Sequence, residues 1–85
     1  MDSKIKVNVK FFAYARELVG EKNIVVEVER GISIKEFIDT IIYDYPDLEN
    51  IREQLIIAVN KTTVRPDKIV KDGDEVALLP PVAGG

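Results

Sequence analysis

One amphipathic helix, set between segments that alternate like β-strands, is the feature that most limits how this chain can fold. Ser33 and Glu36 have the spacing of a capping box, in which each side chain bonds the other residue's free backbone amide at a helix start. Apolar residues then recur at helical spacing until Pro46, which ends the helix. These residues are Ile34, Phe37, Ile38, Ile41, Ile42 and Tyr45. We expect this stripe to pack across a sheet and to form half of the core.

The segments on either side of this helix have the periodicity of strands. From Lys4 to Phe12 apolar side chains alternate with polar ones, which predicts a strand with Ile5, Val7, Val9 and Phe11 facing the core. Further elements are indicated by alternation, by helix formers and by turn residues. In chain order they are a short helix at 13–19 capped by Gly20, a strand at 24–29 antiparallel to the first, a strand at 55–60 that is apolar on both faces, a turn at 61–63, a tight turn at 72–74 and a last strand at 75–79.

This order of elements predicts an α+β domain in which a four- to five-stranded mixed sheet grasps one main helix. The first and last strands are long and apolar, so we expect them to be parallel neighbours in the middle of the sheet. Residues 1–79 would form this domain, and residues 80–85 would form a flexible tail that leaves it from an interior strand.

The composition argues against several classes of function. Of the 85 residues, 46% are apolar and 32% are charged, as in a compact domain. The chain has no cysteine or histidine, which excludes disulfides and thiolate metal sites and argues against acid–base or nucleophilic catalysis by this chain alone. Its net charge of −3 gives no basic field for nucleic acid or anionic lipid. Because no apolar run approaches the roughly 20 residues of a membrane span, we expect a cytoplasmic protein.

The end of the chain is the strongest candidate for chemistry. Two prolines hold an extended backbone and stop the last strand, and two glycines without side chains can thread a narrow tunnel. Six residues reach roughly 20 Å at full extension, enough to place a terminal carboxylate in the pocket of another protein. These residues are Pro80, Pro81, Val82, Ala83, Gly84 and Gly85. The alternative is an ordinary frayed terminus without a function.

No other motif predicts a cofactor or metal site. The segment Asp72-Gly73-Asp74 has only the first positions of a calcium loop and lacks the later bidentate acid. The remaining glycines are isolated turn residues, so the chain has no loop that would cradle the phosphates of ATP.

Three segments carry a resemblance to a known family. Residues 9–20 and 72–85 resemble the opening and the ending of the small subunits of molybdopterin synthases, and Ala58-Val59-Asn60 resembles their middle strand. These subunits form the MoaD/ThiS family of ubiquitin-like β-grasp proteins, and the resemblance runs essentially from end to end. It implies a sulfur carrier for molybdenum cofactor biosynthesis. A ThiS-like sulfur carrier for thiamin biosynthesis is an alternative, as is a ubiquitin-like modifier joined to lysines of substrate proteins through Gly85.

The resemblance also implies how the tail works. A MoeB-like adenylyltransferase of the ubiquitin-activating type would adenylate Gly85 with ATP, and a sulfur donor would convert it to a thiocarboxylate. A MoaE-like large subunit would then bind the tail, from Pro80 to Gly84, and would supply the catalytic residues. The chain itself would bind no cofactor and no metal.

Partner binding is expected at apolar residues beside the tail. Phe12 and Leu79 lie on the strand face opposite to Phe11 and Leu78, and they match partner-facing positions of the family. Thr63 falls where some family members have a third apolar contact. The alternative is that Phe12 and Leu79 complete the core. Two further matches to the opening motif, Arg16 and Glu17, are interpreted as structural.

Overall fold

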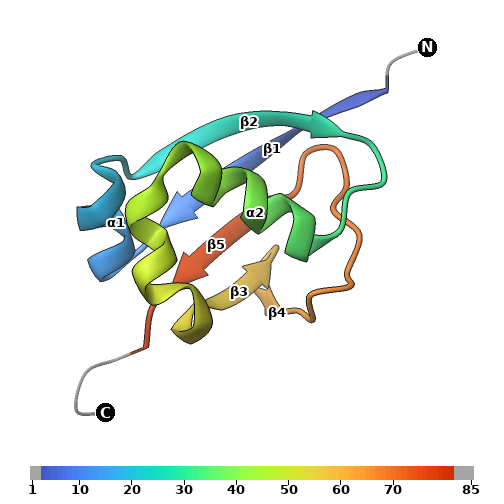
Figure 1. Ribbon diagram of the computed structural model, residues 1–85. Helices are drawn as coiled ribbons and strands as arrows, with labels where there is room; N and C mark the ends of the chain where they lie inside the picture. The colour runs from blue at the N-terminus through green and yellow to red at the C-terminus, as the bar shows by residue number, and fades with distance from the viewer. Residues whose placement is uncertain (1–2, 82–85) are drawn as a thin grey trace.

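A computed structural model describes residues 3–81, so Val82, Ala83, Gly84 and Gly85 of the expected tail lie outside the described residues. Figure 1 shows the arrangement of the described elements. The strands are β1 (Lys4–Phe11), β2 (Asn23–Glu29), β3 (Ile56–Val59), β4 (Thr62–Thr63) and β5 (Glu75–Leu79). The helices are α1 (Ala13–Val19), α2 (Ile34–Asp44) and the 3₁₀ helix η1 (Pro46–Gln54).

The five strands form one mixed sheet in the order β2-β1-β5-β3-β4. Strands β1 and β5 run parallel, with Val9 opposite Val76, whereas the other neighbouring pairs are antiparallel. Helix α2 crosses one face of this sheet (Figure 1). The predicted β-grasp architecture is therefore confirmed, including the parallel pairing of the first and last strands.

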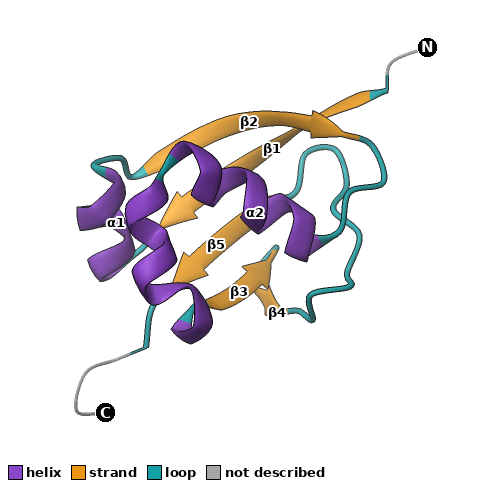
Figure 2. Ribbon diagram, in the orientation of Figure 1, coloured by secondary structure: helices purple, strands orange, loops and turns teal. Residues whose placement is uncertain are grey.

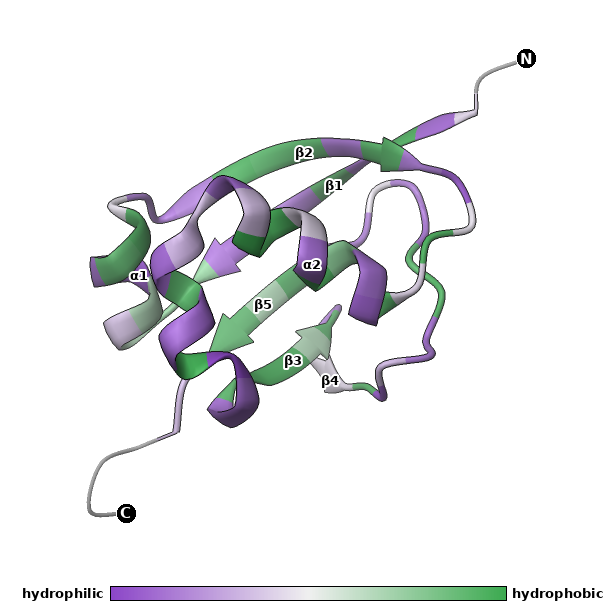
Figure 3. Cartoon of the chain, viewed as in Figure 1, coloured by the Kyte–Doolittle hydropathy of each residue, from purple (hydrophilic) through white to green (hydrophobic). Residues whose placement is uncertain are grey.

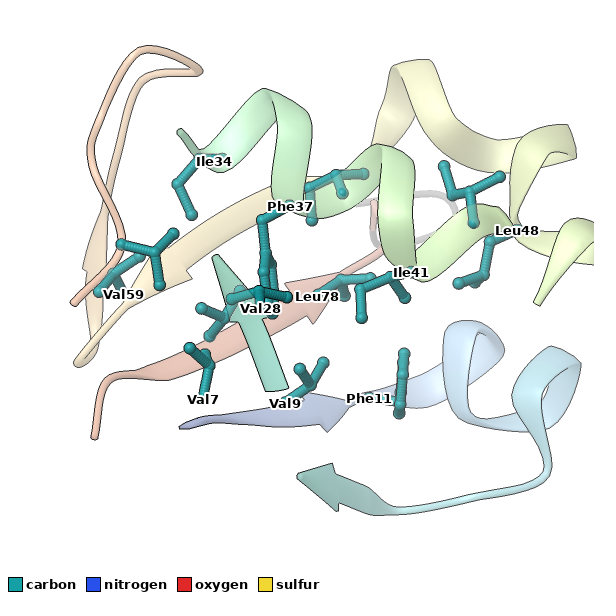
Figure 4. Packing of buried hydrophobic residues seen from close by; sticks show 14 of the residues in the cluster. Val7, Val9, Phe11, Val28, Ile34, Phe37, Ile41, Leu48, Val59 and Leu78 are labelled. Atoms are coloured by element: carbon teal, nitrogen blue, oxygen red, sulfur yellow. The ribbon is translucent and has the colours of Figure 1, made fainter. Parts of the chain in front are cut away.

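The core lies between that sheet face and α2. Hydrophobic and hydrophilic residues alternate along β1 (Figure 3), and the inward side chains of β1 are at most 1% exposed. Figure 4 shows side chains from the strands and from α2 pointing toward one another. The apolar residues predicted for the helix stripe are buried, namely Ile34, Phe37, Ile38, Ile41 and Ile42. Tyr45, at the end of the stripe, packs edge-on against Phe11 with 5.9 Å between the ring centroids.

The start of α2 has the predicted capping box. The Ser33 hydroxyl accepts a hydrogen bond from the Glu36 backbone amide at 3.2 Å, and the Glu36 carboxylate accepts one from the Ser33 amide at 3.1 Å. The bond from the Ser33 backbone is the main reason that the pKa of Glu36 lies below its ordinary value. The helix therefore begins where local chemistry satisfies its first free amide groups.

Two local expectations were incomplete or wrong. Pro46 ends α2 as predicted, but the chain continues directly into η1, whose only buried residue is Leu48. A single buried residue leaves no periodic pattern, so the sequence did not indicate this helix. The turn expected at 61–63 is instead made by Asn60 and Lys61, both with positive φ, and Thr62–Thr63 form β4. Asparagine tolerates this left-handed conformation better than most residues.

The chain between β4 and β5 is a long loop (Figure 2) that closes the end of the core opposite to α1. Its anchor is Val70, which is 1% exposed and whose amide donates to the Ile32 carbonyl at 2.9 Å. None of the helices within residues 3–81 has the length and apolar character needed to cross a membrane.

Candidate functional site

Strand β5 leads to the tail from the interior of the sheet. It pairs with β1 on one side and with β3 on the other, so its last residue, Leu79, leaves from a strand held on both edges. Pro80, which follows it, is half-buried and Pro81 is exposed. The predicted reactive residue, Gly85, and the predicted tail residues 82–84 lie outside the described residues.

The three residues expected to bind a partner line one shallow depression beside the end of β5. Phe12, Thr63 and Leu79 surround it together with Ile56, Ala58 and Ala77, and we call these six residues the outer-face patch. The patch lies on the sheet face away from α2, because its strand residues alternate with core residues such as Val59, Val76 and Leu78. Sequence positions 12, 63 and 79 therefore meet in space as one surface.

The exposure of the patch tests the alternative that Phe12 and Leu79 complete the core. Phe12 is 37% exposed and Ile56 is 48% exposed. Leu79 is half-buried and does not belong to the buried core. The alternative that Phe12 and Leu79 complete the core is thus wrong for both residues. Apolar side chains gathered at the surface are typical of a site that another protein covers.

Backbone hydrogen bonds hold Phe12 at the junction of β1 and α1. Its amide donates to the Leu78 carbonyl at 3.2 Å, and its carbonyl accepts from the Ala15 amide at 3.0 Å. The Arg16 side chain donates through Nε to the Phe11 carbonyl at 3.2 Å, which confirms a structural role for this arginine. The Glu17 side chain is exposed and makes no hydrogen bond or ion pair with the rest of residues 3–81, so its match to the motif has no structural explanation.

Sequence reasoning missed part of the patch and its charged edge. Ile56, Ala58 and Ala77 are patch residues, and Lys10, Lys61 and Glu75 line the same depression. The Lys10 ammonium forms an ion pair with the Glu75 carboxylate at 3.2 Å. One sequence signal did point toward Ile56, namely that β3 is apolar on both faces. Only one face of a strand can pack on the core here, so the apolar residues of the other face must lie on the outer face of the sheet.

The segment Asp72-Gly73-Asp74 forms a structural turn. The Asp72 carboxylate accepts from the Lys6 amide at 2.8 Å. The Asp74 carboxylate accepts from the Lys71 amide at 2.8 Å and from the Asn60 side-chain amide at 2.9 Å. Gly73 has φ of 82°, which suits glycine. Within the described part of the chain, no group of three or more Asp, Glu, His or Cys residues is placed to hold a metal ion.

Comparison with protein families and named proteins gives a consistent result. The model of the ThiS family matches residues 9–85. A protein of Arabidopsis thaliana is 31% identical over 83 residues, which cover 98% of this chain and 86% of that protein. A protein of Mycobacterium tuberculosis is 38% identical over 82 residues, covering 95% and 99%. Both are named molybdopterin synthase sulfur carrier subunit.

Solved structures resemble this fold over nearly its whole length. A putative molybdopterin converting factor subunit 1 of Pyrococcus furiosus superposes with a TM-score of 0.84 at 31% identity, covering 92% of this chain and 99% of that one. SAMP1 of Haloferax volcanii gives 0.85 at 25% identity, covering 94% and 99%. A chain from the complex of subunits 1 and 2 of the molybdopterin-converting factor of Helicobacter pylori gives 0.68 at 29% identity, covering 95% and 100%.

Proposed function

This chain belongs to the ThiS family of ubiquitin-like β-grasp proteins, and from that premise we propose that it is the sulfur carrier subunit of a molybdopterin synthase. The observation that carries the proposal is its full-length similarity to proteins named as such subunits. The outer-face patch supports it, because a carrier without catalytic side chains of its own must dock on the enzymes that act on its tail.

The proposed chemistry takes place at the carboxylate of Gly85. A carboxylate is a poor acceptor at neutral pH, so a MoeB-like partner first joins it to the α-phosphate of ATP and releases pyrophosphate. A sulfide equivalent from a donor then displaces AMP and leaves a thiocarboxylate. Because the thiocarboxylate sulfur is nucleophilic, it can form a bond to carbon of a pterin precursor. Hydrolysis of the acyl–sulfur bond then returns the Gly85 carboxylate and leaves the sulfur on the pterin.

The proposed division of labour follows from the residues of the chain. With no histidine or cysteine, it offers no proton shuttle near neutral pH and no thiolate, so the catalytic groups belong to its partners. A large subunit would bind the outer-face patch and receive the tail, and two such deliveries would complete the dithiolene. The structure of a complex between subunits 1 and 2 from Helicobacter pylori supports a partner of this kind.

Intact-mass measurement tests the proposal directly. The full chain is incubated with ATP, the activating enzyme of the same organism and a sulfur source, and fragmentation locates the added mass. Location is needed because oxidation of Met1 adds nearly the same mass as exchange of one oxygen for sulfur. We expect sulfur at Gly85 and none on a chain that lacks Gly84 and Gly85. Absence of sulfur at Gly85 with a demonstrably active enzyme pair would refute the carrier function.

A second candidate is supported by the similarity to SAMP1, because SAMP1 stands for small archaeal modifier protein 1, as the name of the similar protein of Methanosarcina acetivorans spells out. In that function a lysine amine of another protein would attack the activated Gly85 carbonyl and form an isopeptide bond. An epitope-tagged chain expressed in its own organism would then give a ladder of conjugates. A modifier requires that the ladder vanish when Gly84 and Gly85 are deleted, whereas a pure carrier gives no ladder in either strain.

A further inference from the structure

A second depression adjoins the outer-face patch and differs from it in charge. It is lined by Lys10, Phe11, Phe12, Arg16, Lys22 and Asn23, so it shares Phe12 with the patch and Lys10 with the charged edge of the patch. Three of its lining residues are cations, and none of the described residues lining it is acidic. We call Lys10, Arg16 and Lys22 the cationic notch.

The backbone around β1 positions the notch. The Phe11 amide donates to the Lys22 carbonyl at 3.0 Å, which ties the segment after α1 to the end of β1. Arg16 donates through Nε to the Phe11 carbonyl at 3.2 Å, so its guanidinium is held beside the same strand end. Helix α1, which carries Arg16, lies near the end of the sheet where β5 finishes (Figure 1). The notch is therefore built on backbone that is itself tied to the sheet.

The charges of the notch are only partly compensated within the described residues. Lys10 pairs with Glu75 at 3.2 Å. Lys22 makes no ion pair within residues 3–81, and Arg16 makes none there either. This surplus of positive charge stands on a chain whose net charge is −3. A protein that covers Phe12 removes water from its neighbours, and a cation that loses water without gaining a partner raises the free energy of the complex.

We propose that the large subunit places an aspartate or glutamate side chain against the cationic notch while its apolar residues cover the outer-face patch. The inference rests on the proposed function and adds the chemistry by which the partner is recognised. A protein carboxylate fits better than nucleic acid, because three cations on an acidic chain provide no extended basic track. The apolar contact and the charge contact, whose depressions share Lys10 and Phe12, would together set how the partner is oriented over the tail.

A charge contact of this kind acts mainly on the rate of association. Complementary charges steer encounter and raise association rates by roughly 10- to 1000-fold for whole charge patterns. Salt weakens the effect, because the screening length is only about 10 Å at 0.1 M ionic strength. The prediction is therefore a rate that depends on salt and on Lys22.

The test compares two lysines that have the same charge but different positions. Lys22 lines the notch, whereas Lys68 is exposed in the loop before β5; no described residue forms an ion pair with either. Lys22→Glu and Lys68→Glu therefore change the net charge equally. Association with the large subunit of the same organism is measured by stopped-flow at about 0.02 M and about 0.5 M salt, and circular dichroism verifies that each variant is folded.

We expect Lys22→Glu to slow association about 3- to 10-fold at low salt, with the difference shrinking below about twofold at high salt. Lys22→Gln should lie between the wild type and Lys22→Glu, and Lys68→Glu should stay within about twofold of the wild type. Equal effects of Lys22→Glu and Lys68→Glu on the association rate would refute the proposed contact at the cationic notch and would leave the proposed function intact. A wild-type chain that does not bind the large subunit would overturn both.

Discussion

Phe12 is the residue at which strand, helix and patch meet. Its extended backbone, with φ of −116° and ψ of 149°, makes it the N-cap of α1, and no side-chain hydrogen bond caps that helix. A large apolar side chain at an N-cap does nothing for the helix start, where Ser, Thr, Asp or Asn would each accept a hydrogen bond from a free amide. The proposed partner contact accounts for phenylalanine at this position, because a large subunit would cover the ring.

The substitution Phe12→Asp separates this function from folding. Aspartate is a favoured N-cap, so we expect thermal stability to be kept or slightly raised. Binding of the large subunit should weaken by about 2 to 4 kcal/mol, roughly 30-fold or more, because a charge replaces an apolar anchor at the interface. Isothermal titration calorimetry measures the affinity.

Val25→Asp provides the matched control. Val25 is 66% exposed on β2 and does not line the patch, so the same charge there should leave the affinity within about twofold. Equal weakening by both substitutions would show that added negative charge, and not loss of the Phe12 ring, disrupts binding.

At the scale of elements, one cluster of charges joins the main helix to η1. Arg52 of η1 donates a hydrogen bond to the Asp39 carboxylate of α2. The Arg52 guanidinium Nη1 also lies 3.6 Å from the Glu49 carboxylate. The Lys35 ammonium, one helical turn earlier in α2, lies 3.7 Å from the Asp39 carboxylate. The hydrogen bond from Arg52 is the main cause that lowers the pKa of Asp39, and the same bond raises the pKa of Arg52. The cluster therefore links η1, which hydrophobic periodicity did not reveal, to the surface of α2.

The pH dependence of stability follows from the direction of this shift. A carboxylate with a lowered pKa in the folded state stabilises the fold above its unfolded pKa, about 3.9 for aspartate, and loses that contribution as the pH falls through the folded value. Asp39→Asn should cost about 0.2 to 1 kcal/mol at pH 7, the range for exposed ion pairs. At about pH 2 the difference from the wild type should vanish. Urea unfolding at a series of pH values measures both quantities.

Glu53→Gln serves as the reference for that series. Glu53 is exposed on the same 3₁₀ helix and forms no ion pair with any residue in the described range 3–81. Its replacement should change the unfolding free energy little at either pH. A cost at pH 7 that persists unchanged at pH 2 in Asp39→Asn would mean that the effect does not come from the ionised pair.

For the whole molecule, the hydrophobic core and the predicted reactive end occupy separate parts of the chain. All residues of the buried cluster lie between Ile5 and Leu78, whereas Gly84 and Gly85 follow the last strand. The predicted boundary between the domain (1–79) and the tail (80–85) therefore leaves every residue of the buried cluster within the domain. We therefore expect that stability and the proposed sulfur transfer can be altered independently.

Deletion of Gly84 and Gly85 should therefore abolish sulfur acceptance and change the free energy of unfolding by less than about 0.5 kcal/mol. Ile41→Ala is the opposite case, because Ile41 is fully buried and its truncation should cost about 2 to 5 kcal/mol. Urea unfolding and intact-mass analysis are done on both variants. A large loss of stability in the deletion variant would contradict the separation of domain and tail.

The amino-acid sequence by itself determined the features that depend on neighbours along the chain. Alternation defined the buried face of β1, helical spacing and the Ser33–Glu36 capping box defined α2, and Gly73 marked the turn before β5. Each of these features arises from a repeat or a turn within a few residues. Alternation placed Phe12 and Leu79 on the face away from the core, and the resemblance to the MoaD/ThiS family added the prediction that residues 12, 63 and 79 contact a partner.

Tertiary structure alone decided which distant residues meet. Ile56 joins Phe12 and Leu79 only because β3 pairs with β5, and Lys22 lines the same depression as Lys10 only because β2 returns beside β1, with Asn23 opposite Lys10. The pairing of strands is set by the packing of the whole core, and side-chain spacing within one strand assigns residues to a face without specifying which residues lie beside them on the neighbouring strand. The patch, the notch and η1 therefore appear only when the complete sheet and helix are assembled.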